Sequence, residues 1–387
     1  MFSDKLVNSF RNLKTPFYYY DLDVLQKTLN EVKKLGTAKG YHIHFALKAN
    51  HQSKILETIK NAGLGADCVS GGEVQRALDC GFSPNHIAFA GVGKSDDEIE
   101  LGLKNDLFCF NSESPQELEV INELAGKFGK KARIALRINP NVDANTHHYI
   151  TTGLKENKFG INENDLNAVL EKFPSLKNLE LIGIHFHIGS QIQSMEPFEN
   201  LCFKANALSR QIEEKGFKLT VINVGGGFGI DYEHPHENPI PDFEHFFGLF
   251  EKHLHLKPHQ ELHFELGRSI IGQCGSLITK VLYTKTGQSK TFAIVDAGMT
   301  ELIRPALYQA KHAIKVLTST LPEKMYDVVG PVCESSDTFR TDIILPEIKR
   351  GDLLAICSAG AYGEVMQSTY NLRVARPSVF SDEFDEA

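Results

Sequence analysis

The feature of this sequence that most constrains its fold is a regular alternation of strand-like and helix-like segments across roughly 230 residues. Short apolar runs typical of strands recur at residues 41–48, 65–69, 86–90, 107–110, 132–138, 181–188, 220–224 and 261–265. Amphipathic segments with helical periodicity lie between them, for example at residues 72–80, 95–103, 114–128 and 198–215. Eight consecutive strand–helix units predict an α/β fold built on a (β/α)8 TIM-type barrel, and a doubly wound open sheet is the structural alternative.

The pattern changes after about residue 270. Short strands at residues 291–295, 326–330 and 353–357 are separated by turns, and the one helical segment that we expect there lies at 305–316. An aromatic strand at residues 17–20 precedes the barrel and is a candidate to pair with this region. We therefore predict a barrel domain from residues 25–270, and a second, β-rich domain made of residues 1–24 together with 271–387.

The composition of the chain limits the kinds of molecule that it is expected to bind. The formal net charge is −8 and no basic cluster is present, so neither nucleic acid nor anionic lipid is indicated. The first residues lack the apolar stretch of a secretory signal, and no later run approaches membrane-spanning length. The seven cysteines are scattered, a pattern typical of reduced thiols rather than of disulfides or a zinc site. We expect a cytoplasmic protein whose partner is a small molecule.

Reactive side chains stand at the ends of four predicted strands, where TIM-barrel active sites are built. They are Lys48, His185-Phe-His187 with the following Ser190, Gly225-Gly-Gly-Phe-Gly229, and Glu265. Each has a simpler interpretation when taken alone. Lys48 could be a solvated lysine, the glycine run a tight turn, and Glu265 an ion-pair partner of Arg268.

Taken together, these groups describe a site for pyridoxal 5′-phosphate. In this interpretation Lys48 binds the aldehyde carbon, the glycines hold the phosphate, and His187 faces the ring. Glu265 lies beside the pyridine nitrogen and keeps it protonated. A protonated ring is a strong electron sink, so this arrangement favours decarboxylation at Cα.

A series of motifs resembles that of the fold-type III pyridoxal-phosphate decarboxylases, which share the alanine racemase/ornithine decarboxylase-like fold. The motifs are Phe45-Ala-Leu-Lys-Ala-Asn50, His185-Phe-His-Ile-Gly-Ser-Gln191, Gly225-Gly-Gly-Phe-Gly229, Glu265-Leu-Gly-Arg268, Cys333-Glu-Ser-Ser-Asp337 and Gly360-Ala-Tyr-Gly363. Three further stretches, His147–Gly153, Lys158–Gly160 and Asp296–Tyr308, are most similar to the diaminopimelate decarboxylases within that family. The likeness covers nearly the whole chain in the same order.

The resemblance implies a role for each matching residue. Lys48 would bind the cofactor covalently, and Cys333 would return a proton to Cα, with Lys48 as the alternative donor. The cofactor-binding residues would be Lys48, His187, Ser190, Gly226, Gly227, Glu265, Gly267, Arg268 and Tyr362, and the substrate-binding residues would be Arg268, Arg304, Tyr308, Glu334 and Tyr362. No metal ligand is implied. In this family Cys333 and Glu334 reach the site from a second subunit, so the resemblance implies a homodimer with shared active sites, in which the β-rich domain contributes substrate and dimer contacts.

The implied reaction is pyridoxal-phosphate-dependent decarboxylation of meso-2,6-diaminopimelate to L-lysine, the last step of lysine biosynthesis. Arg304 would bind the distal carboxylate of the substrate and Glu334 its distal ammonium group. Within the family, decarboxylases of ornithine, arginine, D-lysine or carboxynorspermidine are the alternatives. The chain departs from the usual family pattern at Leu266, where proline is common, and at Thr300-Glu301, where asparagine-aspartate is common.

Two alternatives lie outside the decarboxylases. The H-x-H pairs His42-Ile-His44 and His185-Phe-His187 have a spacing that suits metal ligands on barrel strands, as in a metal-dependent hydrolase. Against this, the first pair lies well before the end of its strand. A non-catalytic pyridoxal-phosphate-binding protein is the other alternative, and the β-rich domain argues against it.

Overall fold

The computed structural model describes residues 2–142 and 158–384. The stretch His147–Gly153 lies outside these residues. The chain forms two compact units, one made of residues 29–229 and 242–267 and the other of residues 1–28, 230–241 and 268–387. The segment 230–241 lies inside the range predicted for the barrel, but it belongs to the second of these units. Among the described residues, no helix is both long and apolar enough to cross a membrane.

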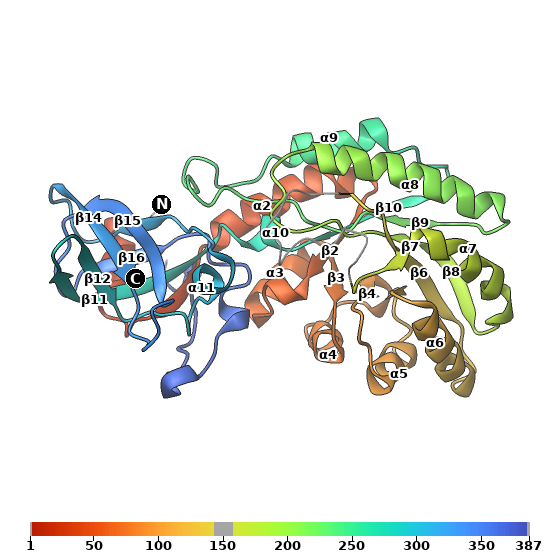
Figure 1. The fold of residues 1–387 in the computed structure, drawn as a ribbon, viewed down its shortest axis with the longest axis horizontal. Helices are drawn as coiled ribbons and strands as arrows, with labels where there is room; N and C mark the ends of the chain where they lie inside the picture. Colours follow the sequence, from red (N-terminus) through yellow and green to blue (C-terminus); the bar gives the residue numbers. More distant parts are fainter. Residues whose placement is uncertain (1, 143–157, 385–387) are drawn as a thin grey trace. The chain divides into compact units, whose positions relative to one another are not determined.

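The first unit is a closed ring of eight parallel strands, as the sequence predicted (Figure 1). The strands are β2 (His42–Ala46), β3 (Gly65–Cys68), β4 (Ile87–Phe89), β5 (Cys109–Ser112), β6 (Ala132–Asn139), β8 (Leu179–His185), β9 (Val221–Asn223) and β10 (Glu261–Leu266). Two pairings close the ring, because β5 pairs with β6 and the last strand, β10, pairs with the first, β2. The short strand β7 (Ile161–Asn162) pairs with the last two residues of β6, Ile138 and Asn139.

Helices follow the strands and surround the ring (Figure 1). They are α2 (Leu22–Leu35), α3 (Ser53–Asn61), α4 (Gly71–Asp79), α5 (Asp96–Lys104), α6 (Pro115–Lys127), α7 (Glu163–Lys172), α8 (Glu196–Glu214) and α9 (Phe243–His253). Ser70, Ser95 and Ser114 each cap a helix by accepting a hydrogen bond from a backbone N–H in its first turn. These caps stop each helix from extending back into the preceding loop, where the strand ends present their side chains.

Aromatic packing attaches α9 to the last strand of the barrel. Phe243, Phe246, Phe247 and Phe250 recur at helical spacing and are all about 1% exposed, so they form one buried face. The rings of Phe246, Phe247 and Phe250 lie 5.7, 5.1 and 5.0 Å from the ring of Phe264 on β10. This cluster fixes the position of β10, which carries Glu265.

Among the described residues, the second unit is a mixed sheet accompanied by short helices. Its strands are β1 (Phe17–Tyr20), β11 (Gly275–Thr286), β12 (Thr291–Val295), β13 (Ile314–Val316), β14 (Glu323–Val329), β15 (Thr338–Pro346), β16 (Leu353–Ile356) and β17 (Val379–Phe380), and its helices are α1 (Asp4–Arg11), α10 (Arg268–Ile271) and α11 (Arg304–Tyr308). The predicted aromatic strand β1 pairs with β11 and β17. The β-rich second domain is therefore confirmed, together with the placement of the N-terminal strand in it.

The helix predicted at 305–316 is wrong beyond its first turn. Helix α11 ends at Tyr308, because Gln309 adopts a left-handed conformation with φ of 54°. Residues 314–316 instead form β13, which pairs with β16. Backbone bonds from Ala313 to Tyr232 and from Leu317 to Leu353 hold both ends of this strand. The β-branched residues of β13 gain more from this sheet pairing than they would from a helix.

Candidate active site

Lys48 lies at the carboxyl-terminal end of the barrel, in the short 3-10 turn Leu47–Ala49 that follows β2. Its Nζ donates a hydrogen bond to Oδ2 of Asp67 on β3, at 3.1 Å. The Lys48 side chain is 37% exposed, whereas that of Asp67 is fully buried. Burial and the nearby charge of Glu265 raise the pKa of Asp67. The amine is thus held by one carboxylate and is accessible to solvent.

Glu265 on β10 is a buried carboxylate with several hydrogen-bond partners. Its Oε1 accepts bonds from the amides of Asn111 and Asn223, at 2.9 and 2.8 Å, and its Oε2 lies 2.9 Å from Nε2 of His185. Burial acts to raise the pKa of Glu265, but the His185 bond and the charge of Lys48 outweigh it and hold that pKa well below its usual range. Glu265 is therefore ionised at neutral pH.

The loops after β8 and β9 are joined by backbone hydrogen bonds. Ile192 donates to Gly227 at 2.9 Å, and Gly229 donates to Ile192 at 3.0 Å. Gly227 has a φ of +103°, which favours glycine. A Cβ on Gly226 would meet the carbonyl oxygen of Glu265 at 1.9 Å. These two glycines are thus required by the chain path, and the pairing brings the Gly225–Gly229 loop beside the segment that contains Ser190.

His187 lies against the same loop. The backbone N–H of Gly226 is 3.4 Å from His187 Nδ1, which therefore acts as an acceptor. Burial lowers the pKa of His187 well below its usual value, and the charges of Arg137 and Lys48 act in the same direction. The ring is neutral at pH 7. Gly267 lies in the turn that directly follows β10.

Sequence reasoning missed several polar residues of the barrel end. Asp67, Asn111 and Asn223 are all essentially unexposed, yet each lies on an otherwise apolar strand. Arg137 and Glu113 form a second buried pair, 2.6 Å apart, and Glu113 also accepts from the Gly160 N–H. A polar residue within an apolar strand was the available signal, because such a residue must find a partner when buried.

In the second unit, two buried arginines share one tyrosine. Arg268 donates to the Tyr232 hydroxyl, and its guanidinium carbon lies 4.8 Å from the centre of the Tyr362 ring. The guanidinium carbon of Arg304 lies 4.8 Å from the centre of the Tyr232 ring. Sequence reasoning predicted both arginines and Tyr362 and missed Tyr232. Tyr362 has a φ of 55°, which is uncommon for a residue with a side chain and often marks a functional position.

Arg304 is positioned by a histidine. Its Nη1 lies 2.8 Å from Nε2 of His312, and His312 Nδ1 lies 2.8 Å from the carbonyl oxygen of Cys357. The carbonyl can only accept, so Nδ1 carries the proton and Nε2 accepts from the arginine. Burial lowers the pKa of His312 to about 3. Among the described residues, no carboxylate forms an ion pair with Arg304, although this arginine is only 5% exposed.

The remaining predicted residues are more exposed. Cys333 is an exposed free thiol. Glu334 is also exposed and accepts a hydrogen bond from the Tyr370 hydroxyl at 2.8 Å. Tyr308 is the last residue of α11. Of the departures from the family pattern, Leu266 is buried in the β10–β2 pairing, and Glu301 stabilises its own turn by accepting from the N–H of Gly298.

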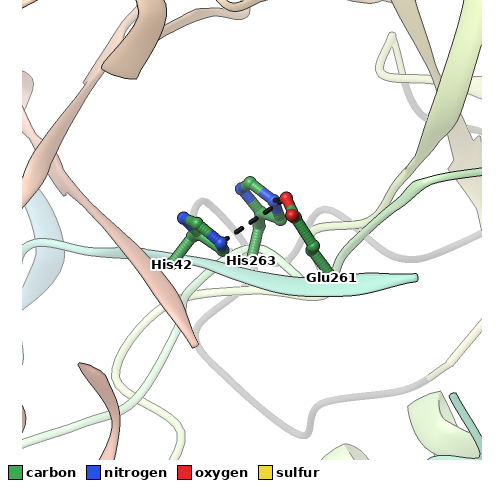
Figure 2. A group of neighbouring side chains, drawn as sticks. All are labelled: His42, Glu261 and His263. Carbon is green, nitrogen blue, oxygen red and sulfur yellow. Dashed lines mark ion pairs between the residues drawn. The ribbon is translucent and has the colours of Figure 1, made fainter. Parts of the chain in front are cut away.

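A separate group of histidines lies at the amino-terminal end of the barrel. His42 and His263 are direct neighbours in the β2–β10 pairing, and Glu261 lies two residues before His263, on the same face (Figure 2). His44 contacts His263, with 3.0 Å between the two ring nitrogens. Burial lowers the pKa of His44 to about 4 and that of His263 well below its usual value. The pair His42-Ile-His44 therefore lies toward the opposite end of β2 from Lys48.

Comparison with known proteins supports the resemblance over the whole chain. Residues 22–272 match the pyridoxal binding domain of the pyridoxal-dependent decarboxylases. The chain is 54% identical over 378 residues to the diaminopimelate decarboxylase of Bacteroides thetaiotaomicron, covering 97% of this chain and 98% of that protein. It is 46% identical to the diaminopimelate decarboxylase of Helicobacter pylori, over 94% of this chain and 89% of that protein.

Solved structures give the same result. The crystal structure of diaminopimelate decarboxylase from Helicobacter pylori complexed with L-lysine superposes with a TM-score of 0.88 at 43% identity, covering 96% of this chain and 92% of that one. The corresponding structure from M. jannaschii, also with L-lysine, gives 0.88 at 31% identity, covering 97% and 89%. Both the sequence and the fold agree along nearly the full length. This chain therefore belongs to the pyridoxal-dependent decarboxylases, a family of carboxy-lyases, and within it to the diaminopimelate decarboxylases.

Proposed function

We propose that this protein decarboxylates meso-2,6-diaminopimelate to L-lysine with pyridoxal 5′-phosphate as its cofactor. The observation that carries the proposal is the combination of two sets of residues. The barrel end presents an amine and a fixed carboxylate, Lys48 and Glu265, and the second unit presents a buried guanidinium, that of Arg304. The first set suits the cofactor and the second suits a substrate with a distal carboxylate.

The barrel residues fit the cofactor. An ionised carboxylate offers about four acceptor positions, and three of those on Glu265 are filled by Asn111, Asn223 and His185. The fourth can accept one more N–H, such as that of a pyridinium ring. Asp67 Oδ1, on the carboxylate beside Lys48, is buried without a hydrogen-bond partner among the described residues. It can therefore accept a hydrogen bond from a bound molecule. When bound, pyridoxal phosphate supplies an electron sink for the carbanion left at Cα by loss of carbon dioxide.

The chain's own residues would then have distinct tasks. Lys48 would hold the cofactor covalently through its Nζ. Ser190, Gly226 and Gly227 would hold the phosphate through backbone and hydroxyl donors, and the family resemblance assigns Gly267, Arg268 and Tyr362 to the cofactor as well. His187, which is neutral, would face the ring. Glu265 holds the proton on the ring nitrogen, because a carboxylate with a low pKa stabilises a neighbouring cation.

Substrate recognition is assigned to the second unit. A buried guanidinium without a carboxylate partner is costly, and a substrate carboxylate would remove that cost for Arg304. His312 accepts from one side of the guanidinium and so fixes its orientation, and Tyr308 and Arg268 add hydrogen-bond donors. Glu334 would bind the distal ammonium group. Ornithine and D-lysine lack the distal carboxylate, which favours diaminopimelate over both.

Cys333 is proposed as the proton donor to Cα, acting in the active site of a partner subunit. Its exposure agrees with a residue that completes a site on another chain. The segment after Tyr370 supports a dimer as well, because Leu372 and Val374 are 92% and 81% exposed, and apolar side chains of this size are commonly covered in an assembly.

The experiment is to measure formation of lysine and carbon dioxide from meso-diaminopimelate, with and without added pyridoxal phosphate. Ornithine, arginine and D-lysine serve as alternative substrates, and Lys48→Ala is the control. Cofactor-dependent release of lysine that the variant lacks is the expected result. Turnover of another amine in place of diaminopimelate would keep the chemistry but overturn the assignment of Arg304. Failure to turn over any of the four substrates would overturn the decarboxylase proposal.

A further inference from the structure

The histidine group at the amino-terminal end of the barrel contains a nitrogen that is free to bind a metal ion. His263 is 2% exposed, and its Nε2 has no hydrogen-bond partner among the described residues. This atom lies 3.6 Å from a carboxylate oxygen of Glu261. The same Glu261 oxygen lies 3.5 Å from Nε2 of His42. The three ligand atoms all lie within 4.8 Å of one another, and Figure 2 shows the side chains gathered on one side of the strands.

The neighbouring hydrogen bonds determine which nitrogen of His263 is available. His44 Nδ1 lies 3.2 Å from the carbonyl oxygen of His86, which can only accept, so Nδ1 carries the proton. His44 Nε2 is then an acceptor, and the atom facing it at 3.0 Å, His263 Nδ1, must donate. A neutral imidazole has one N–H, so His263 Nε2 carries a lone pair. A metal-binding histidine usually donates its other ring N–H to an acceptor that fixes its orientation, and here that acceptor is His44 Nε2.

We propose that His42, Glu261 and His263 bind a divalent transition-metal ion, with Zn²⁺ as the best match and water as a fourth ligand. Two imidazole nitrogens and a carboxylate oxygen form a frequent zinc ligand set. Ligands about 2.1 Å from a tetrahedral ion lie about 3.4 Å from each other, close to the 3.5 and 3.6 Å separations found here. Within the described parts of the chain this is the one group of three or more such side chains with this spacing.

One adjustment is needed when the ion binds. The rings of His42 and His263 are stacked, with centroids 4.5 Å apart and an angle of 12° between the planes, whereas a metal ion lies in the plane of each ring that binds it. His263 is fixed by His44 and by Phe108, whose ring is parallel to it at 5.0 Å. The His42 side chain is 45% exposed, so it can turn at little cost. An open depression of about 270 Å³ adjoins the group and leaves room for the ion and its water.

The position of the group indicates a structural role. His42 is on the first strand of the ring, and Glu261 and His263 are on the last, so the ion would join β2 to β10 where the barrel closes. Such a link ties together segments more than 200 residues apart in the sequence, as the His44–His263 separation of 219 shows. An ion that binds only the folded chain stabilises it in proportion to the logarithm of its concentration over Kd.

The test uses the full-length protein, saturated with pyridoxal phosphate and freed of metal with a chelator. It is titrated with Co²⁺, which reports its ligands in the visible spectrum, and then with Zn²⁺ in competition. We expect one equivalent of Co²⁺ per chain, a four-coordinate spectrum without thiolate bands, and displacement by Zn²⁺. His42→Gln and Glu261→Gln are both exposed changes, and each should weaken binding by at least about 100-fold, more than the loss of an outer partner. Zn²⁺ should raise the Tm of the wild type by a few degrees and leave the Tm of both variants unchanged.

The matched control is His234→Gln, because His234 and Glu237 are an exposed histidine–carboxylate pair 3.9 Å apart, outside the group. This variant should bind Co²⁺ like the wild type. The absence of a stoichiometric site, thiolate bands that point to the cysteines, or unchanged affinity in His42→Gln and Glu261→Gln would each overturn the proposal. None of these measurements depends on decarboxylation, so the proposal stands or fails separately from the proposed function.

Discussion

The same two neighbouring strands, β2 and β10, carry ionisable groups at both of their ends, and the two ends differ in how those groups are satisfied. At the carboxyl-terminal end, Glu265 accepts three hydrogen bonds from buried donors. At the amino-terminal end, Glu261 is 57% exposed, and one nitrogen of the buried His263 has no partner among the described residues. At the carboxyl-terminal end, fixed donors surround the buried charge of Glu265, an arrangement that suits catalysis. At the amino-terminal end, the lone pair of His263 lies beside exposed side chains, an arrangement that suits a metal ion.

The largest difference between the ends should appear when one side chain is truncated at the start of β2 and another in the turn that follows it. Lys48→Ala deletes the amine that we propose holds the cofactor, so kcat/KM should fall by at least about 1,000-fold. His42→Ala, at the other end of the same strand, should leave kcat/KM within about twofold of the wild type. Steady-state rates with saturating pyridoxal phosphate measure both. Comparable losses of kcat/KM in the two variants would show that both ends of β2 are needed for catalysis.

Two glutamates at opposite ends of β10, Glu265 and Glu261, allow a second comparison. Glu265→Gln keeps the shape of the side chain but removes the negative charge, so it no longer favours a protonated ring nitrogen. We expect kcat to fall by roughly 100-fold, the usual consequence of removing one preorganised electrostatic group. Glu261→Gln should keep the wild-type kcat. If Glu265→Gln retained full activity, the carboxylate would be a structural partner of His185 rather than a partner of the cofactor.

The second unit allows substrate recognition to be separated from the chemistry of the barrel end. Arg304→Lys replaces a two-donor fork by a point charge, so kcat/KM for meso-diaminopimelate should fall by about 10-fold to 100-fold. The affinity for pyridoxal phosphate, measured by fluorescence titration, should not change. Arg350→Lys is the control, since Arg350 also lies over a tyrosine ring, that of Tyr283, but is exposed. A weaker affinity for the cofactor in Arg304→Lys would contradict the division of roles.

The sequence was sufficient for the architecture of both units because the signals were local. Eight apolar runs alternating with amphipathic segments can close only in a few ways, and all eight strands are present at the predicted places. Lys48, His187 and Glu265 were predicted because they lie at strand ends, and their side chains therefore had to gather at one face of the ring. The helix expected at 305–316 failed because the partners of β13, such as Leu354, are distant in the sequence.

The residues that the sequence did not reveal act through other side chains. Asn111 and Asn223 matter because both amides reach the same Glu265 oxygen, a coincidence that depends on strand order and register. His312 is important only through its contact with Arg304. At the amino-terminal end, the H-x-H spacing drew attention to His42 and His44, but His42 is joined by Glu261 and His263 from another strand. Register across β2 and β10 was needed to identify that group.

The smallest expected effect is a difference in acid stability between the two ends. The pKa of Glu265 is lower in the folded protein than its value of about 4.3 in an unfolded chain. Its ionised form therefore stabilises the folded state above pH 4.3, and this contribution is lost as the pH falls toward the folded-state pKa. Between pH 5 and 3.5, the wild type should lose free energy of unfolding with an extra slope of up to about 1.4 kcal/mol per pH unit, and Glu265→Gln should lack that slope. Urea unfolding at several pH values measures it, and Glu261→Gln, which changes an exposed carboxylate, should follow the wild type. Equal slopes in all three proteins would mean that the three donors around Glu265 do not hold it ionised, and that the two ends of the barrel differ less than their hydrogen bonds imply.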